Sequence, residues 1–212
     1  VCSDPGRPTH GSIGCEYRRE TGRKSDASVL ARVVQRRHPL DVPSAGDIVV
    51  HMRTGSGLEG PDCWNNVSHC TQIVPGACCH FVYALPRTYY AKVMAQLPRP
   101  TTARAKRIVI VTSINSCGAW ECSETIVKYS LAYLKQAYAY FEEQGYQVEV
   151  RTPHGVDTDF MYMASARTFV LGGGGFSAFV GSVVNRSGGR AVHQGSLCGD
   201  SNQLCMVNGT VG

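Results

Sequence analysis

The stretch of sequence that most constrains the fold runs from residue 157 to residue 187. It reads as a short helical pattern, a buried strand with the sequence TFVLG, four glycines from Gly172 to Gly175, and a second helical pattern that opens at Phe176. A helix that follows glycines leaves backbone N–H groups without partners at its start, and such ends bind anions, phosphate above all. A flexible surface turn is the bland alternative, but this glycine run lies between two apolar segments. The stretch therefore predicts a strand–turn–helix unit with an anion site.

Strand and helix patterns alternate along the rest of the chain, and Gly145 is placed to end the longest helix. Crossover helices between consecutive strands indicate a parallel sheet that is covered on both faces. We therefore predict an α/β, Rossmann-like fold with helices on both faces of the sheet. The expected strands are Asp47–Arg53, Arg107–Ser113, Tyr146–Arg151, 168–172 and Ala191–Gln194, and the expected helices are Ala27–Arg37, Pro86–Leu97, Glu124–Gln144, 157–166 and 176–187.

Ten cysteines are present, and several lie one short loop apart, which predicts disulfides and an oxidising compartment. Cys117–Cys122 and Cys198–Cys205 are expected as local pairs. Sequons at Asn66, Asn185 and Asn208 agree with the lumen of the secretory pathway, such as the Golgi, or the extracellular space. A zinc cluster is the alternative use of part of this set, but its members lack the usual ligand spacing: His69, Cys70, Cys78, Cys79 and His80.

The pattern divides the chain into three parts. Residues 1–46 are predicted to form an N-terminal extension with one helix, tethered through Cys2 and Cys15. Residues 47–195 are predicted to form the Rossmann-like domain, and residues 196–212 are predicted to form a tail pinned by a disulfide. Residues 54–82 are expected to be a long loop that carries four of the cysteines.

Composition and missing motifs exclude several classes of function. The net charge is +5, but Lys and Arg are scattered, which argues against nucleic-acid binding. The sequence contains no run of about 18 apolar residues, so no membrane span is predicted. Hydrolase and kinase signatures are missing. The pattern from Gly173 to Ala178 formally matches a dinucleotide fingerprint, but it follows the fourth expected strand and no acidic residue ends a following strand, so a nicotinamide or flavin enzyme is rejected.

His51 and Arg53 end the first expected strand, and alternation along a strand places both on the same side. In parallel sheets, ligands bind at the carboxyl ends of the strands, and arginine offers a planar fork for phosphate. The alternative is a solvated arginine beside a packed histidine.

Asp157, Thr158 and Asp159 form a DxD triplet, which in some sugar-transfer enzymes binds a metal–nucleotide complex. The triplet directly precedes a helical pattern, so Asp157 or Thr158 is predicted to be an N-cap and no metal is expected to be needed. An aspartate at this place can still accept hydrogen bonds from a sugar or a base.

Taken together, these segments resemble the donor-binding half of inverting fucosyltransferases with a GT-B-like fold. The resemblance covers about residues 47–187 and consists of IVVHMR, PRTYYAKVM, RIVIVTS and DFMYMASARTFVLGGGGFSAFVG, in this order. It implies a glycosyltransferase that transfers a sugar from GDP-fucose, or a similar nucleotide sugar, to a glycan or glycoprotein acceptor. Arg53 and Ser177 would bind the diphosphate, Gly174, Gly175 and Phe176 would shape the pocket, Asp159 would lie near the nucleoside, and His51 would lie beside the donor. No cofactor is implied.

The sequence departs from the family where an acidic residue usually follows the arginine. Here Glu59 and Asp62 are the nearest acids, so the candidate bases are His51, Glu59 and Asp62. About 46 residues precede the first strand, so the acceptor site is expected to be reduced, built from the loop of residues 54–82, or supplied by another chain. The rival hypothesis is a secreted, non-catalytic structural or glycan-binding module that keeps the fold.

Overall fold

The structure is a computed structural model. It describes residues 31, 34, 41–55, 58, 60–66, 71–72, 81–82, 84–99, 106–114, 123–151 and 155–194.

Five parallel strands form the central sheet, in the order β5-β4-β1-β6-β7. Every neighbouring pair in this sheet is parallel, and β1 is the central strand, with β4 on one side and β6 on the other. The prediction of a parallel α/β sheet is confirmed. The strands are β1 (Ile48–His51), β4 (Arg107–Val111), β5 (Gln147–Arg151), β6 (Thr168–Val170) and β7 (Arg190–Val192).

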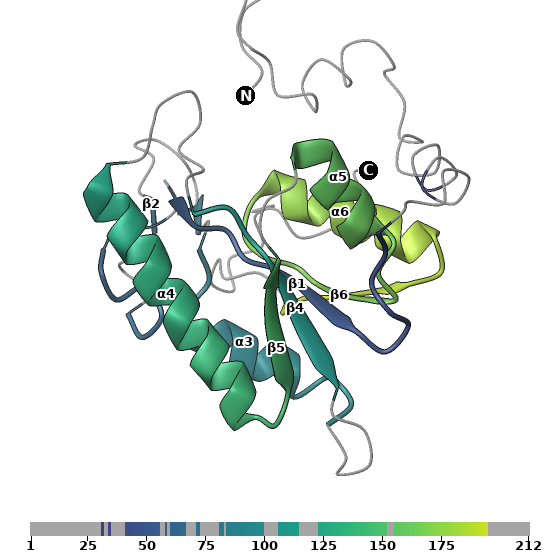
Figure 1. Ribbon diagram of the computed structural model, residues 1–212, viewed down its shortest axis with the longest axis horizontal. Helices are drawn as coiled ribbons and strands as arrows, with labels where there is room; N and C mark the ends of the chain where they lie inside the picture. The colour runs from purple at the N-terminus through teal and green to yellow at the C-terminus, as the bar shows by residue number, and fades with distance from the viewer. Residues whose placement is uncertain are drawn as a thin grey trace, which may run out of the picture.

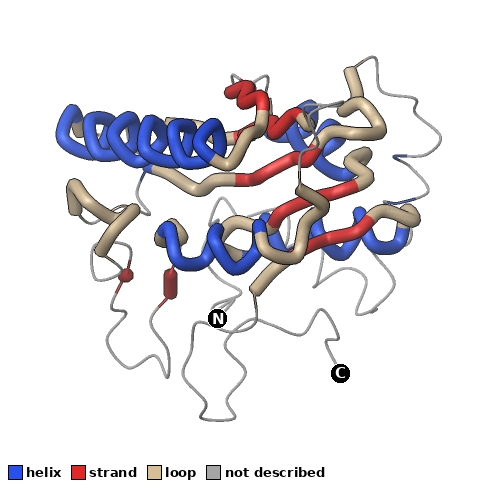
Figure 2. Tube along the Cα trace, turned by 90° about the horizontal axis from the view of Figure 1, so that it is seen from below, coloured by secondary structure: helices blue, strands red, loops and turns tan. Residues whose placement is uncertain are grey.

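In the described part of the chain, helices α3 to α6 cover both faces of the sheet (Figures 1 and 2). α3, which precedes β4, and α4, which follows β4, pack on one face, whereas α5 and α6 follow β5 and β6 and pack on the other. The predicted coverage of both faces is therefore confirmed. The helices are α3 (Arg87–Met94), α4 (Glu124–Glu143), α5 (Val156–Ala164) and α6 (Gly175–Arg186).

Side chains of β1 alternate between two cores because both faces of the sheet are covered. Val50 packs with Tyr90 and Phe141 on the face of α3 and α4. Val49 packs with Val180 of α6 and with other residues on the face of α5 and α6. This burial on both faces explains why the strand is a continuous apolar run.

Trp64 anchors the segment after β1 to the first core. Its ring stacks on Tyr90 at 5.4 Å between centroids and meets Tyr140 edge-on at 5.7 Å. Cys63 beside it is buried and disulfide-bonded. This cysteine is the only one of the ten that lies in the described part of the chain, so the other predicted disulfides stay predictions.

Residues before β1 pack against the face of α5 and α6. Ala31 and Val34 are helical, as predicted, and are buried against Ala164 and Val183. Cys2 and Cys15, on which the predicted tether depends, lie outside the described residues, as does the tail of residues 196–212.

The loop predicted over residues 54–82 contains structure that the sequence pattern did not indicate. β2 (Thr71–Gln72) and β3 (Phe81–Val82) pair antiparallel as a separate two-stranded ribbon. Two-residue strands have too few positions to show an alternation, so periodicity carries no signal for them.

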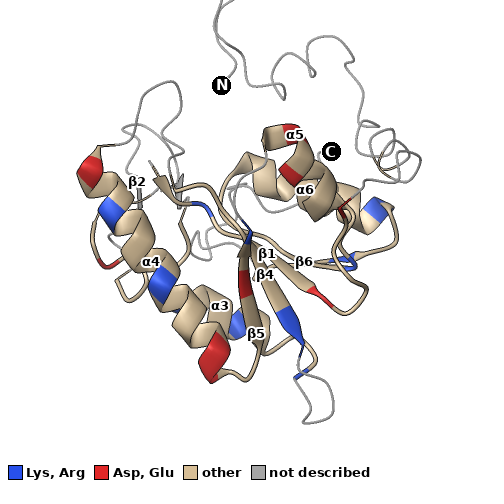
Figure 3. Cartoon of the chain, viewed as in Figure 1, with Lys and Arg blue, Asp and Glu red and all other residues tan. Residues whose placement is uncertain are grey.

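Charged residues are dispersed over the described part of the molecule, and α4 carries both signs along its length (Figure 3). None of the helices in the described ranges combines the length and the apolar character that a membrane crossing needs.

Candidate functional site

A cleft of about 410 Å³ lies at the carboxyl ends of β1 and β4. It lies where the strand order reverses: β4 and β5 extend from one side of β1, and β6 and β7 from the other. This switch point is where open parallel sheets bind ligands. The cleft is lined by His51, Met52, Arg53, Thr54, Val111, Thr112, Ser113, Gly155, Val156, Asp159, Met163 and Phe176.

The residues that end β1 alternate as the sequence predicted. His51 and Arg53 are partly exposed, whereas Met52 and Thr54 are buried. Met52 N–H donates to the Val111 carbonyl at 3.0 Å, so pairing with β4 continues beyond the strand. The structure thus brings His51 and Arg53 to the same cleft.

The His51 ring lies between the end of β6 and the start of α6. It meets the Phe176 ring edge-on at 5.7 Å between centroids. Its Nδ1 atom is buried and has no hydrogen-bond partner among the described residues. Burial, and secondly the charge of Arg53, lower the pKa of His51 from 6.5 to about 4. The imidazole is therefore neutral at pH 7, which makes it a weak general base in the absence of ligand.

Protonation of His51 should make stability depend on pH. Because its pKa is about 4 in the folded protein and 6.5 in the unfolded chain, only the unfolded chain binds the proton between these values. The free energy of unfolding should fall as the pH drops from 6.5 towards 4, by at most about 3 kcal/mol. Urea denaturation of the wild type and of His51→Asn at several pH values measures the difference. All other titratable groups are the same in both proteins, so parallel curves for the two would contradict the assignment.

The glycine run forms a tight turn between β6 and α6. Gly174 has φ 88° and ψ 164°, a conformation that is open to glycine, and it is the N-cap of α6. No side chain caps this helix. The first hydrogen bond of the helix runs from Ala178 N–H to the Gly174 carbonyl. The N–H groups of Gly175 and Phe176 thus lie at the positive end of the helix dipole.

Ser177 is fully buried, and its hydroxyl oxygen accepts a hydrogen bond from Gly172 N–H at 2.8 Å. The hydroxyl therefore closes the turn from inside. Gly174, Gly175 and Ser177 do not line the cleft, whereas Phe176 does. The part of the turn that reaches the cleft is thus the first turn of α6 at Phe176.

Asp159 lies in the first turn of α5 and lines the cleft. Arg151, at the end of β5, donates from Nε to Asp159 Oδ1 at 3.4 Å and also pairs with Asp41. The Arg151 guanidinium lies 4.1 Å from the centre of the Tyr162 ring. Asp159 therefore has a structural partner, and a ligand at this place would share it.

The predicted N-cap of α5 is wrong. The helix begins at Val156 with Gly155 as its N-cap, and no side chain caps it. Gly155 adopts φ 103°, which lets the chain enter the helix before the first polar residue. Asp157 and Asp159 lie in the first turn, where their negative charges interact favourably with the positive end of the helix dipole.

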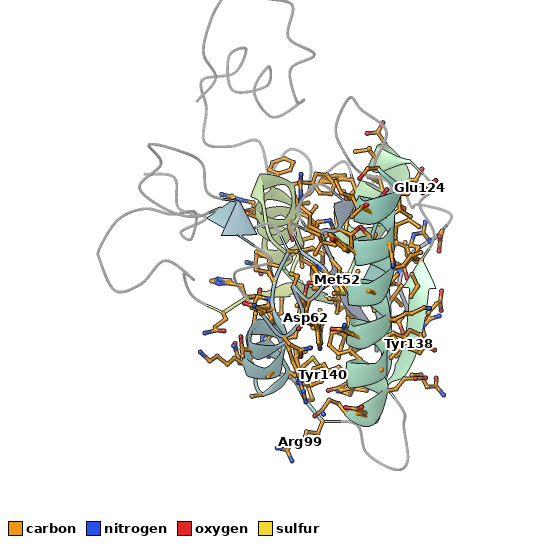
Figure 4. The ribbon with its side chains drawn as sticks, turned by 90° about the vertical axis from the view of Figure 1, so that its left-hand side faces the viewer. Met52, Asp62, Arg99, Glu124, Tyr138 and Tyr140 are labelled. Carbon is orange, nitrogen blue, oxygen red and sulfur yellow. The ribbon has the colours of Figure 1, made fainter. Side chains whose placement is uncertain are left out.

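The candidate bases are not all brought to the cleft. Asp62 does not line it and accepts a hydrogen bond from Asn65 Nδ2 at 2.8 Å. Its neighbours Cys63 and Trp64 pack with α3 and α4, and Figure 4 shows Asp62 on this side of the molecule. Glu59 lies outside the described residues.

Several residues of the cleft were missed by sequence reasoning. Thr112 and Ser113 follow β4 just as His51 and Arg53 end β1, so the strand-end rule would have found them. Gly155 and Val156 gave no comparable signal. In the described ranges, no group of three or more His, Cys, Asp or Glu side chains is arranged to hold a metal ion. His69, Cys70, Cys78, Cys79 and His80 lie outside those ranges.

Comparison with known proteins finds no protein-family model that matches the chain and no curated protein that matches its sequence.

Proposed function

We propose that the chain is a glycosyltransferase that resembles the inverting fucosyltransferases and binds a nucleoside-diphosphate sugar, such as GDP-fucose, in the cleft at the switch point. The observation that carries this proposal is the position of Arg53. It lies at the carboxyl end of β1, in the same cleft as Phe176 of the first turn of α6. A guanidinium and a helix N-terminus around one space favour an anion with several oxygens.

The dimensions and the chemistry of the cleft support a ligand of this class. Ligand clefts commonly measure about 300–1,000 Å³, and this one measures about 410 Å³. Arg53 is its only lining cation among the described residues, and Thr112 and Ser113 add hydroxyl groups. Val156 and Phe176 provide apolar surface next to these polar groups. Asp159 offers a carboxylate to the nucleoside, as the resemblance implies.

In the proposed reaction, an acceptor hydroxyl attacks the anomeric carbon while the bond from that carbon to the diphosphate breaks. Arg53 and the α6 N-terminus stabilise the negative charge that develops on the leaving diphosphate. The proton of the acceptor passes to a base. His51 is the candidate base inside the cleft, and a bound diphosphate would raise its pKa towards a useful range.

One observation favours the non-catalytic alternative. Asp159 is the only carboxylate among the described lining residues, and it pairs with Arg151. A module that binds the nucleotide sugar or a glycan without transferring it needs no base. Titration with GDP separates this module from a purely structural one, which has no reason to bind GDP.

The surroundings of the reaction are part of the proposal. The acceptor is a glycan or a glycoprotein, and another chain completes the acceptor site if residues 54–82 do not. The disulfide-bonded Cys63 supports an oxidising compartment, either the secretory lumen or the extracellular space. The tether through Cys2 and Cys15 is part of the same proposal, and both cysteines lie outside the described residues.

The activity is tested with GDP-fucose labelled in the sugar. Release of labelled fucose to water or to a mixture of glycan acceptors should exceed that of the Arg53→Ala variant at equal protein concentration. Addition of a chelator should leave the rate unchanged, because no metal is part of the proposal. Binding of GDP without any turnover across the acceptors would favour the non-catalytic module. Loss of activity with chelator and recovery with manganese would contradict the metal-free reaction.

A further inference from the structure

The backbone that follows Arg53 is held by a buried hydroxyl. Thr54 is 1% exposed, and its Oγ1 atom donates to the Ser113 carbonyl at 2.8 Å. The same oxygen lies 3.1 Å from Thr112 Oγ1. Because Thr54 gives its single proton to the carbonyl, the Thr112 hydroxyl is the donor of the second bond. Both bonds tie the residue after Arg53 to the end of β4.

A second buried hydroxyl holds the next residue. Gly55 N–H donates to Ser130 Oγ at 2.9 Å, and Ser130 is completely buried in α4. Ser130 Oγ in turn donates to the Ile126 carbonyl at 2.8 Å. The Ser130 proton is thus directed back into its own helix, and its lone pairs are left to accept from Gly55. Gly55 has φ 69°, so the chain turns at this residue.

The backbone on both sides of Arg53 is therefore held by hydrogen bonds. Before it, Met52 N–H bonds to the Val111 carbonyl of β4, and after it, Thr54 and Gly55 bond to β4 and α4. A side chain with four rotatable bonds gains direction only when its own backbone is held, and its entropy loss on binding is then smaller. A ligand that needs two parallel hydrogen bonds from a guanidinium is sensitive to this direction.

We propose that Thr54 and Ser130 are positioning residues, whose hydroxyls fix the backbone after Arg53 and so orient its guanidinium towards the anionic part of the ligand. The inference rests on the proposed function for the identity of the ligand, but not for the orientation of Arg53. Neither hydroxyl is assigned a contact with the ligand.

The orientation is tested without any ligand. The Arg53 Nε–Hε signal is assigned by NMR from its loss in Arg53→Lys, and its order parameter is measured in the wild type, Thr54→Val and Ser130→Ala. Both variants should lower the order parameter, and Thr54→Ser, which keeps the hydroxyl, should restore the wild-type value. Ser165→Ala is the matched control, since Ser165 donates to the Met161 carbonyl four residues back in α5, as Ser130 does in α4. Unchanged Arg53 order in Thr54→Val and Ser130→Ala would overturn the inference whether or not GDP binds.

A double-mutant cycle tests the consequence for binding. Thr54→Val should weaken the binding of GDP roughly three- to tenfold in the wild-type background. This is the size expected for a lost neutral hydrogen bond. It should have no further effect in the Arg53→Ala background, because the loss acts through Arg53. An equal loss in both backgrounds would show a general structural effect and overturn the inference. If the wild type does not bind GDP, the proposed function fails, and the order parameter decides the inference on its own. Should Thr54→Val fail to fold, Ser130→Ala takes its place in both measurements.

Discussion

Replacing Gly172 by alanine is expected to destabilise the protein by about 3 kcal/mol or more. A Cβ atom at this position would lie 2.4 Å from the His51 carbonyl oxygen and 3.0 Å from His51 Nδ1. The nearer contact is backbone of the central strand, so no change of rotamer relieves it. The end of β6 would have to move away from β1 at the edge where the cleft lies.

Gly175→Ala is the matched control in the same glycine run. A Cβ atom there meets nothing within 4 Å, and Gly175 is the first residue of α6. Alanine should therefore be neutral or stabilise by up to about 1 kcal/mol, since it favours helix more than glycine does. Urea denaturation of the two variants measures the difference. Equal stabilities would mean that the turn does not pack on β1 as described.

Arg53→Ala is expected to weaken binding of GDP roughly ten- to a hundredfold, the loss of about 1.5–3 kcal/mol from a charge-assisted hydrogen bond. Folding should be little affected, because Arg53 is partly exposed and stands outside the two sheet cores. Arg167→Ala is the control for the change in net charge. Arg167 is exposed and precedes β6, so it lies at the opposite edge of the sheet.

Calorimetry with GDP on both variants and the wild type checks this expectation. Equal weakening by Arg53→Ala and Arg167→Ala would show that the effect is long-range electrostatics, which added salt screens. An Arg53→Ala variant that binds as tightly as the wild type would place the diphosphate elsewhere.

The elements of the sheet could be predicted because their sequences carry strong apolar signals. β1 and β4 are continuous apolar runs, as strands that are buried on both faces must be. Gly145 was expected to end α4, and it follows the helix with φ 85°. The start of α5 was misplaced because a glycine N-cap supplies no side-chain signal. The β2–β3 ribbon was missed because its strands are two residues long.

The site could be predicted only in part. Alternation along β1 placed His51 and Arg53 together, and this arrangement is confirmed. The ion pair between Asp159 and Arg151 could not be foreseen, because Arg151 also pairs with Asp41 and these segments meet only through the tertiary fold. The inward hydrogen bond of Ser177 depends on the geometry of the glycine turn, which composition does not specify.

The most direct test of the proposed site is a calorimetric titration of the wild-type protein with GDP, with guanosine as the matched control. Two phosphates should bind to Arg53 and the α6 N-terminus, so GDP should bind at least roughly a hundredfold more tightly than guanosine, a difference of about 3 kcal/mol. Added salt should weaken the binding of GDP and leave the binding of guanosine unchanged. Absence of GDP binding, or equal affinity for guanosine and GDP, would contradict an anion site formed by Arg53 and the N-terminus of α6 in this cleft.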